Sequence, residues 1–250
     1  MRRKTLIIFL SVVVLLILVL LHFRDHKQET ATDGKAVETV SVSAITTIVD
    51  CPKYKVEEDE NGNISVTVDG DMVYLLSDVT EDTHFRDAIG FAIASGVLRV
   101  DDSRFKPDYG VTRGQFAMAL YRFLCGGEDD VPQKEFSDVT KASAYYGAAC
   151  WTDGNELLTA DDEDAFHPND FVTCETALTI LYRVAGRPKA AEDLPEDYPY
   201  AAKVSDYAKS AISWAIGQKL IDVKENVWYP TQAVSRAQLS ALLQKYSELF

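Results

Sequence analysis

Residues 105–115 read FKPDYGVTRGQ, and residues 166–176 read FHPNDFVTCET. A third stretch, residues 228–238, reads WYPTQAVSRAQ. Each combines an aromatic-x-Pro sequence with a Ser or Thr that can cap a helix, and this capping residue recurs after 61 and then 62 residues. Self-similarity at a fixed period is the signature of a repeat architecture. One unit of this size cannot bury a full core, so we expect the three units to pack against one another.

Each repeat is predicted to form two helices joined by a loop. In the first unit, apolar residues recur at helical spacing over residues 88–93, which gives an amphipathic first helix. The second helix begins at a capping box, in which a Ser or Thr is followed three residues later by a Gln. The boxes pair Thr112 with Gln115 and Ser235 with Gln238, whereas Thr173 has no such partner.

Arg113 and Arg236 directly follow the capping residues of these two boxes. An arginine in the first helical turn faces the positive end of the helix dipole, at a cost of about 0.3 kcal/mol. Beside free backbone N–H groups, however, it would complete an anion-binding site. A surface arginine paired with a nearby acid explains the same pattern equally well. In the second unit Cys174 and Glu175 follow the capping residue, and because a carboxylate repels an anion, we expect this unit to be silent or to serve packing.

Charge and motif content exclude several classes of function. The chain has 250 residues and a net charge of −14, and beyond the first 23 residues 22 basic residues face 39 acidic ones. This balance argues against a nucleic-acid binder and against adsorption to anionic lipid. The four histidines lie in no catalytic motif, so we predict no enzymatic activity, no metal and no cofactor. The four cysteines are compatible with buried free thiols or with one disulfide.

The N-terminal part reads as an anchor, a stalk and a small sheet. Residues 1–4 form a basic cytoplasmic tip, and the apolar residues 5–23 are predicted to be a signal anchor, a transmembrane helix, with a cleaved signal peptide as the alternative. Residues 24–50 are polar and read as a stalk. Residues 51–75 alternate in hydropathy around the turn sequences Asn-Gly and Asp-Gly, which predicts a three-stranded β-meander.

From residue 76 onward the repeats resemble S-layer homology domains. These domains begin with an aromatic-Ser-Asp-Val box, continue through a helix with Ala-Ile and Trp, and carry a Phe-x-Pro and a Thr-Arg-Ala-Glu/Gln motif. The opening box is LSDV at residues 76–79 and FSDV at residues 136–139, and it is blurred to YAAK at residues 200–203. The repeats then span residues 76–126, 136–186 (with a degenerate motif) and 198–250, with Asp78, Asp138, Trp151, Trp214, Pro107, Pro168 and Pro230 at structural positions.

The resemblance implies a mainly α fold in which three helix-loop-helix repeats form a pseudo-threefold bundle with grooves between its lobes. It further implies that the grooves bind a secondary cell-wall polysaccharide, often with a ketal-linked pyruvate whose carboxylate contacts the motif arginine. Carried over by position, the glycan-binding residues are Arg113, Arg236, Thr112, Gln115, Ser235 and Gln238. The expected location is the outer face of the cell membrane or the bacterial wall. The alternative is a membrane-anchored scaffold that binds a surface protein and no longer binds glycan.

Overall fold

The computed structural model describes residues 48–127, 131, 133–190, 193–225 and 227–250. The basic tip, the predicted anchor at residues 5–23 and most of the stalk lie outside these residues. Within the described ranges, no helix is long and apolar enough to cross a membrane. The last residues of the predicted stalk already contact the repeats, because the Val49 N–H donates to the Phe123 carbonyl at 3.0 Å.

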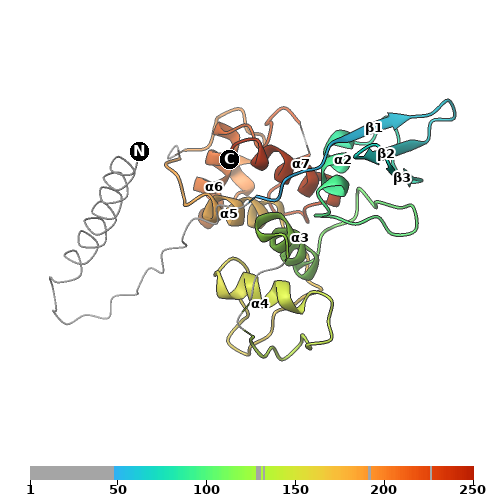
Figure 1. Cartoon of the computed structure of the whole chain (residues 1–250). Helices are drawn as coiled ribbons and strands as arrows, with labels where there is room; N and C mark the ends of the chain where they lie inside the picture. Colours follow the sequence, from blue (N-terminus) through green and yellow to red (C-terminus); the bar gives the residue numbers. More distant parts are fainter. Residues whose placement is uncertain (1–47, 128–130, 132, 191–192, 226) are drawn as a thin grey trace, which may run out of the picture. The chain divides into compact units, whose positions relative to one another are not determined.

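The structure has a pair of α-helices in each of the three stretches that the sequence predicts to be repeats, and a small sheet precedes them (Figure 1). The sheet explains why the fold is only in part α-helical. The three pairs of helices are α2 (Arg86–Ala94) with α3 (Arg113–Cys125), α4 (Tyr146–Gly154) with α5 (Cys174–Val184), and α6 (Lys209–Gly217) with α7 (Arg236–Ser247). Two short 3-10 turns, η1 (Ala201–Lys203) and η2 (Asp206–Ala208), precede α6.

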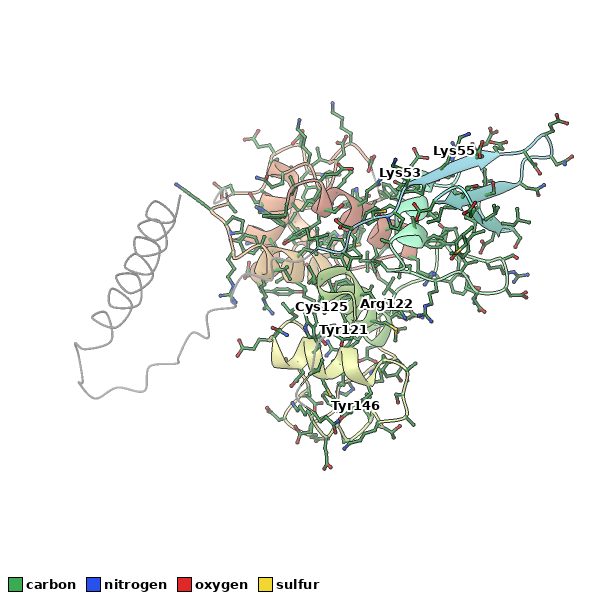
Figure 2. All side chains as sticks on the ribbon, viewed as in Figure 1. Lys53, Lys55, Tyr121, Arg122, Cys125 and Tyr146 are labelled. Atoms are coloured by element: carbon green, nitrogen blue, oxygen red, sulfur yellow. The ribbon has the colours of Figure 1, made fainter. Side chains whose placement is uncertain are left out.

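The second helix of each unit packs against the first helix of another unit. Helix α3 packs on α4, α5 on α6, and α7 returns to α2, so the contacts close a cycle of three. Aromatic rings fill two of these interfaces, where the ring centres of Tyr121 and Trp151, and those of Tyr182 and Trp214, lie 5.6 Å apart. Figure 2 shows Tyr121 on α3. The two tryptophans therefore join neighbouring units.

Three buried valines close the cycle through their backbones. The Val111 N–H donates to the Val234 carbonyl at 2.9 Å, Val234 donates to Val172 at 2.8 Å, and Val172 donates to Val111 at 3.0 Å. All three side chains are at most 1% exposed. Because each bond joins two different repeats, the three second helices begin at fixed positions relative to one another.

The predicted three-stranded meander is confirmed. Strands β1 (Tyr54–Glu58), β2 (Ile64–Val68) and β3 (Met72–Leu76) form one antiparallel sheet in the order β1-β2-β3. The apolar residues of β2 are buried, and β1 and β2 both contact α2. At the interface of α7 with α2, the Gln244 side chain of α7 donates to the hydroxyl of Tyr54 in β1 at 3.1 Å. The sheet therefore contributes a contact to this interface, whereas an aromatic pair joins the helices at the other two.

Gly90 in α2 allows this close approach of the sheet. A Cβ atom at this position would collide with Val56 and would lie 2.9 Å from the Tyr54 ring. We therefore expect Gly90→Ala to lower the free energy of unfolding by about 1–3 kcal/mol, a typical cost of overpacking. Urea unfolding measures the effect.

Gly147 in α4 provides the matched control, since a Cβ atom there meets no atom within 4 Å. Gly147→Ala should raise stability by up to about 1 kcal/mol through helix propensity alone. Equal stabilisation by both substitutions would contradict the docking of the sheet on α2.

Candidate anion-binding groove

Each second helix begins against the aromatic-x-Pro segment of another unit, and we call each such contact a junction. At the Arg113 junction, the N–H groups of Arg113 and Gly114 donate to the carbonyls of Asp170 and Pro168 at 2.8 and 2.9 Å. The same pair of bonds recurs at the other two junctions, at 2.9–3.0 Å. In one, the N–H groups of Arg236 and Ala237 donate to the carbonyls of Tyr109 and Pro107. In the other, the N–H groups of Cys174 and Glu175 donate to the carbonyls of Gln232 and Pro230. The expectation that free backbone N–H groups bind an anion is therefore wrong, because neighbouring carbonyls already satisfy them.

The predicted caps form as expected. Thr112 with Gln115, and Ser235 with Gln238, make both reciprocal bonds of a capping box. The Thr173 hydroxyl accepts from the Thr176 N–H and also bonds to the Thr176 hydroxyl, and without a Gln at position 176 no capping box forms, as the sequence predicts. The capping side chains thus satisfy the third N–H of each helix, and the junction carbonyls satisfy the first two.

The two motif arginines are held by carbonyl groups rather than by acids. Arg113 donates from Nε to the Phe166 carbonyl at 2.8 Å and from Nη2 to the Thr159 carbonyl at 2.9 Å. Its guanidinium carbon lies 5.1 Å from the centre of the Phe166 ring. Among the described residues neither Arg113 nor Arg236 forms an ion pair. The alternative reading of these arginines as partners of a nearby acid is wrong as well.

Arg236 repeats this geometry at its own junction. Its Nε donates to the Phe105 carbonyl at 2.6 Å, and its Nη2 donates to the Arg99 carbonyl at 2.7 Å. The guanidinium carbon lies 4.7 Å from the centre of the Phe105 ring. Burial lowers the pKa of both arginines from the ordinary value, and nearby aspartates partly oppose this shift. Each arginine therefore joins two repeats and also brings a positive charge to its junction.

Asp78 and Asp138 hold the aromatic-x-Pro segments in place. The Asp78 carboxylate accepts from the N–H groups of Phe105 and Lys106, both at 2.8 Å. Asp138 accepts in the same way from Phe166 and His167 at 2.8 and 2.7 Å. In the third unit Ala202 stands at the Asp position of the box, and the ring of Tyr200, two residues earlier, lies 4.7 Å from the ring of Tyr229. Two of the three segments are thus fixed by a carboxylate.

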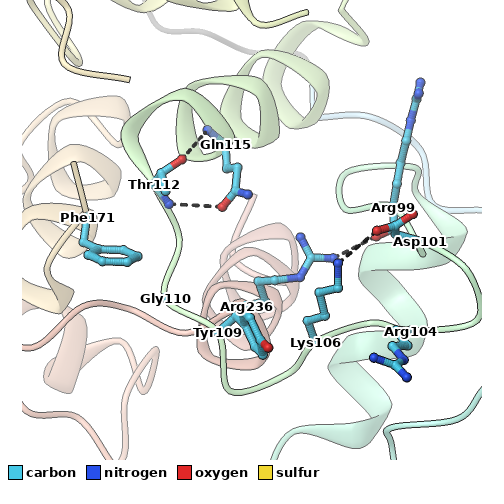
Figure 3. Close-up of a pocket in the computed structure, with 10 residues that line it drawn as sticks. All are labelled: Arg99, Asp101, Arg104, Lys106, Tyr109, Gly110, Thr112, Gln115, Phe171 and Arg236. Atoms are coloured by element: carbon cyan, nitrogen blue, oxygen red, sulfur yellow. Dashed lines mark hydrogen bonds and ion pairs between the residues drawn. The ribbon is translucent and has the colours of Figure 1, made fainter. Parts of the chain in front are cut away.

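The Arg236 junction opens into a cavity of about 370 Å³, which we call the Arg236 groove (Figure 3). Four cationic side chains and one carboxylate line it, and the Lys106 ammonium lies 2.9 Å from the Asp101 carboxylate. This bond lowers the pKa of Asp101. The complete lining consists of Arg99, Asp101, Arg104, Lys106, Tyr109, Gly110, Thr112, Gln115, Phe171 and Arg236.

Two exposed aromatic rings flank this groove. Tyr109 is 68% exposed and Phe171 is 62% exposed, although both are large and largely apolar. Gly110 lies between them, and a Cβ atom at Gly110 would come within 3.0 Å of Phe171. Cations beside exposed rings suit a ligand that is anionic and also has apolar faces, as a charged sugar does.

The groove gathers only some of the predicted site residues. Thr112, Gln115 and Arg236 line it together, whereas Arg113 lies at another junction and Ser235 and Gln238 serve the α7 cap. Sequence reasoning missed Arg99, Arg104 and Lys106. The signal was present in the loop of the first unit, because it carries three cations where the second unit has Thr159, Ala165 and His167.

The Arg113 junction has the opposite charge. The carboxylates of Asp170, Asp138 and Asp161 act on Arg113 and oppose the fall in its pKa. His167 stands where the first unit has Lys106, and it lies 2.6 Å from Asp161. This bond raises the pKa of His167 and lowers the pKa of Asp161. The Arg113 junction therefore presents excess negative charge.

The third junction is closed by Glu175, which is 4% exposed. Its carboxylate accepts from the Ser205 N–H at 3.0 Å, the Ser205 hydroxyl at 2.8 Å and the Tyr207 hydroxyl at 3.2 Å. Burial and the charge of Glu175 raise the pKa of the neighbouring Cys174 to about 12. The expectation that this unit serves packing agrees with the geometry.

The cysteines and acids form no other site within the described part of the chain. Cys51, Cys150 and Cys174 are free thiols, and the Cys125 thiol donates to the Tyr121 carbonyl at 2.8 Å. No group of three His, Cys, Asp or Glu side chains in that part is arranged to hold a metal ion.

The first repeat matches a known family. Residues 76–117 match the family model of the S-layer homology domain, and they include Asp78, α2 and the loop that carries Arg99, Arg104 and Lys106. A search of curated proteins found no match for the chain. The matched domain is generally a non-catalytic module that binds cell-wall polysaccharide. The match at residues 76–117 therefore supports a location at the cell surface or in the cell wall.

Proposed function

We propose that this chain attaches to the bacterial wall by binding an anionic secondary polysaccharide in the Arg236 groove. The observation that carries the proposal is a cluster of four cations around one cavity in a chain whose net charge is −14. Long-range attraction of an anion by such a chain is weak, so recognition depends on a local group of donors. The groove supplies that group.

The chemistry of the groove favours a carboxylate on a sugar, such as a ketal-linked pyruvate. The Arg236 guanidinium uses Nε and one amino group on backbone carbonyls, which fixes its plane and leaves Nη1 as a further donor. Charge-assisted bonds from fixed donors are the strong ones, at about 1.5–3 kcal/mol each. Tyr109 and Phe171 offer flat apolar faces for the sugar ring.

The second and third repeats complete this module in our proposal. The third provides Arg236 and the second provides Phe171, so the groove needs all three repeats although only the first matches the family model. With residues 5–23 as a membrane anchor, such a chain links the cell membrane to the wall. The bound polymer is attached to peptidoglycan.

Co-sedimentation with purified wall sacculi tests the proposal. The full-length chain in mild detergent should sediment with intact sacculi and stay in the supernatant after chemical removal of the secondary polymer. Sedimentation with stripped sacculi would exclude the polymer as the ligand. A failure to sediment with intact sacculi would contradict wall binding altogether.

One observation favours the alternative of a protein scaffold. Strand β3 lies at the edge of the sheet, and Met72, Val73 and Leu75 on it are 55, 56 and 62% exposed. Exposed apolar residues on an edge strand are typical of a surface that pairs with another protein. In that case Leu75→Lys would release a surface-protein partner, whereas wall sedimentation would stay unchanged.

A further inference from the structure

The three junctions share one backbone plan but differ in the side chains of the facing loop. Both motif arginines hydrogen-bond to two carbonyls of that loop and lie over its aromatic ring at similar distances. The guanidinium groups of Arg113 and Arg236 are therefore presented alike. A difference in anion binding between their junctions must come from other residues.

The loop side chains differ in charge at matched positions. Arg99 and Thr159 both offer their backbone carbonyl to a motif arginine, yet only Arg99 adds a cation. Lys106 and His167 both pair with the loop aspartate, Asp101 or Asp161. The His167–Asp161 bond at 2.6 Å keeps that imidazole occupied.

A third matched pair separates the two junctions further. Tyr109 and Asp170 both accept the first N–H of a second helix through their carbonyls. The Tyr109 side chain places an exposed ring beside the groove, whereas the Asp170 side chain places a carboxylate near Arg113. The Asp170 carboxylate would repel an anionic sugar, whereas the Tyr109 ring offers such a sugar an apolar face.

We infer that Arg99, Lys106 and Tyr109, rather than the motif arginine, decide which junction binds an anionic sugar, and that the chain has one such site. The inference rests on the proposed function. It makes attachment monovalent for each chain, because the Arg113 junction is acidic and the Glu175 junction is closed by its own carboxylate. A monovalent module gains no avidity from its own repeats.

The backbone permits a transfer of this site to the Arg113 junction. Lys106 and His167 have nearly the same left-handed backbone, with φ of 60° and 55°, so a lysine fits at position 167. Arg113 donates to the backbone carbonyl of Thr159 and not to its side chain, so Thr159→Arg keeps that bond. The triple variant Thr159→Arg/His167→Lys/Asp170→Tyr therefore places counterparts of Arg99, Lys106 and Tyr109 at the Arg113 junction, and Ala165 stays at the position of Arg104.

Isothermal titration of the full-length chain with a methyl glycoside bearing a ketal-linked pyruvate tests the inference. We expect one equivalent to bind to the wild type and two to the triple variant. A control variant, Glu57→Gln/Glu60→Gln/Asp71→Asn, raises the net charge similarly at exposed positions in β1 and in the two turns of the meander, and it should still bind one equivalent.

Each outcome separates the inference from the function on which it rests. No binding by the wild type contradicts the proposed ligand, and the inference falls with it. Two or three equivalents bound by the wild type contradict the inference alone. A folded triple variant that still binds one equivalent contradicts it too, and the wild-type stoichiometry remains decisive if that variant does not fold.

Discussion

Replacing Arg104 and Lys106 with glutamine should weaken binding to the wall polymer about 100-fold and leave the fold intact. Both side chains line the Arg236 groove, and Arg104 is exposed. Loss of two charge-assisted contacts of about 1.5 kcal/mol each gives an effect of this size. Within the part of the chain that the structure describes, the only ion pair lost is Lys106 with Asp101, which is solvent-accessible and contributes at most about 1 kcal/mol to stability. Polymer binding measured by surface plasmon resonance gives the affinity, and urea unfolding gives the stability.

Lys53→Gln/Lys55→Gln is the matched control for this variant. It removes two positive charges from exposed positions on and just before β1 (Figure 2). Neither lysine belongs to the groove lining. Its affinity should stay within about twofold of the wild type, because screened surface charges act weakly over distance. Equal losses in the two variants would mean that net charge, and not the groove, governs attachment.

Exposed cations make a cleaner test than the motif arginines. Alanine at Arg113 and Arg236 would remove four hydrogen bonds to carbonyls that join different repeats, together with two contacts over aromatic rings. Such a variant would lose stability as well as charge, so lost binding would have two explanations. The sequence alone favours these arginines as probes, and the geometry of the junctions argues against them.

Local signals explain which parts of the structure could be predicted. A capping box involves residues three positions apart, and the meander depends on two short turn sequences, so both follow from neighbouring residues. The helix pairs follow from the repeat period. In the capping boxes and the turns, the side chains that determine the local structure lie within a few residues of the backbone whose conformation they fix.

The junctions could not be predicted, because they join residues far apart in the chain. Arg236 meets the Phe105 carbonyl across 131 positions, and Glu175 meets Ser205 across 30. The order in which three similar units pack decides which loop faces which helix. Local patterns in a single sequence do not reveal that packing order. The sequence therefore predicts that the first N–H groups of the second helices lack hydrogen-bond partners, whereas the carbonyls of the aromatic-x-Pro segments of other units accept from them.

Asp78→Ala should lower the free energy of unfolding by about 3 kcal/mol and abolish polymer binding. The substitution leaves two backbone N–H groups without their carboxylate acceptor, and one belongs to Phe105, which is fully buried. Unsatisfied buried donors and lost charge-assisted bonds cost about 1–3 kcal/mol each. The released loop would no longer hold Lys106 and Arg104 at the groove.

Asp138→Ala tests whether this effect on binding belongs to one loop. Asp138 makes the same two bonds to Phe166 and His167, so the loss of stability should be similar. Its loop faces the acidic Arg113 junction, however, and we expect polymer binding by the folded protein to stay within about threefold of the wild type. Binding measured well below each unfolding transition separates the two effects. Equal loss of binding in both variants would show that attachment depends on the integrity of all three repeats and not on the Arg236 groove, since the two aspartates differ mainly in the junction that their loops face.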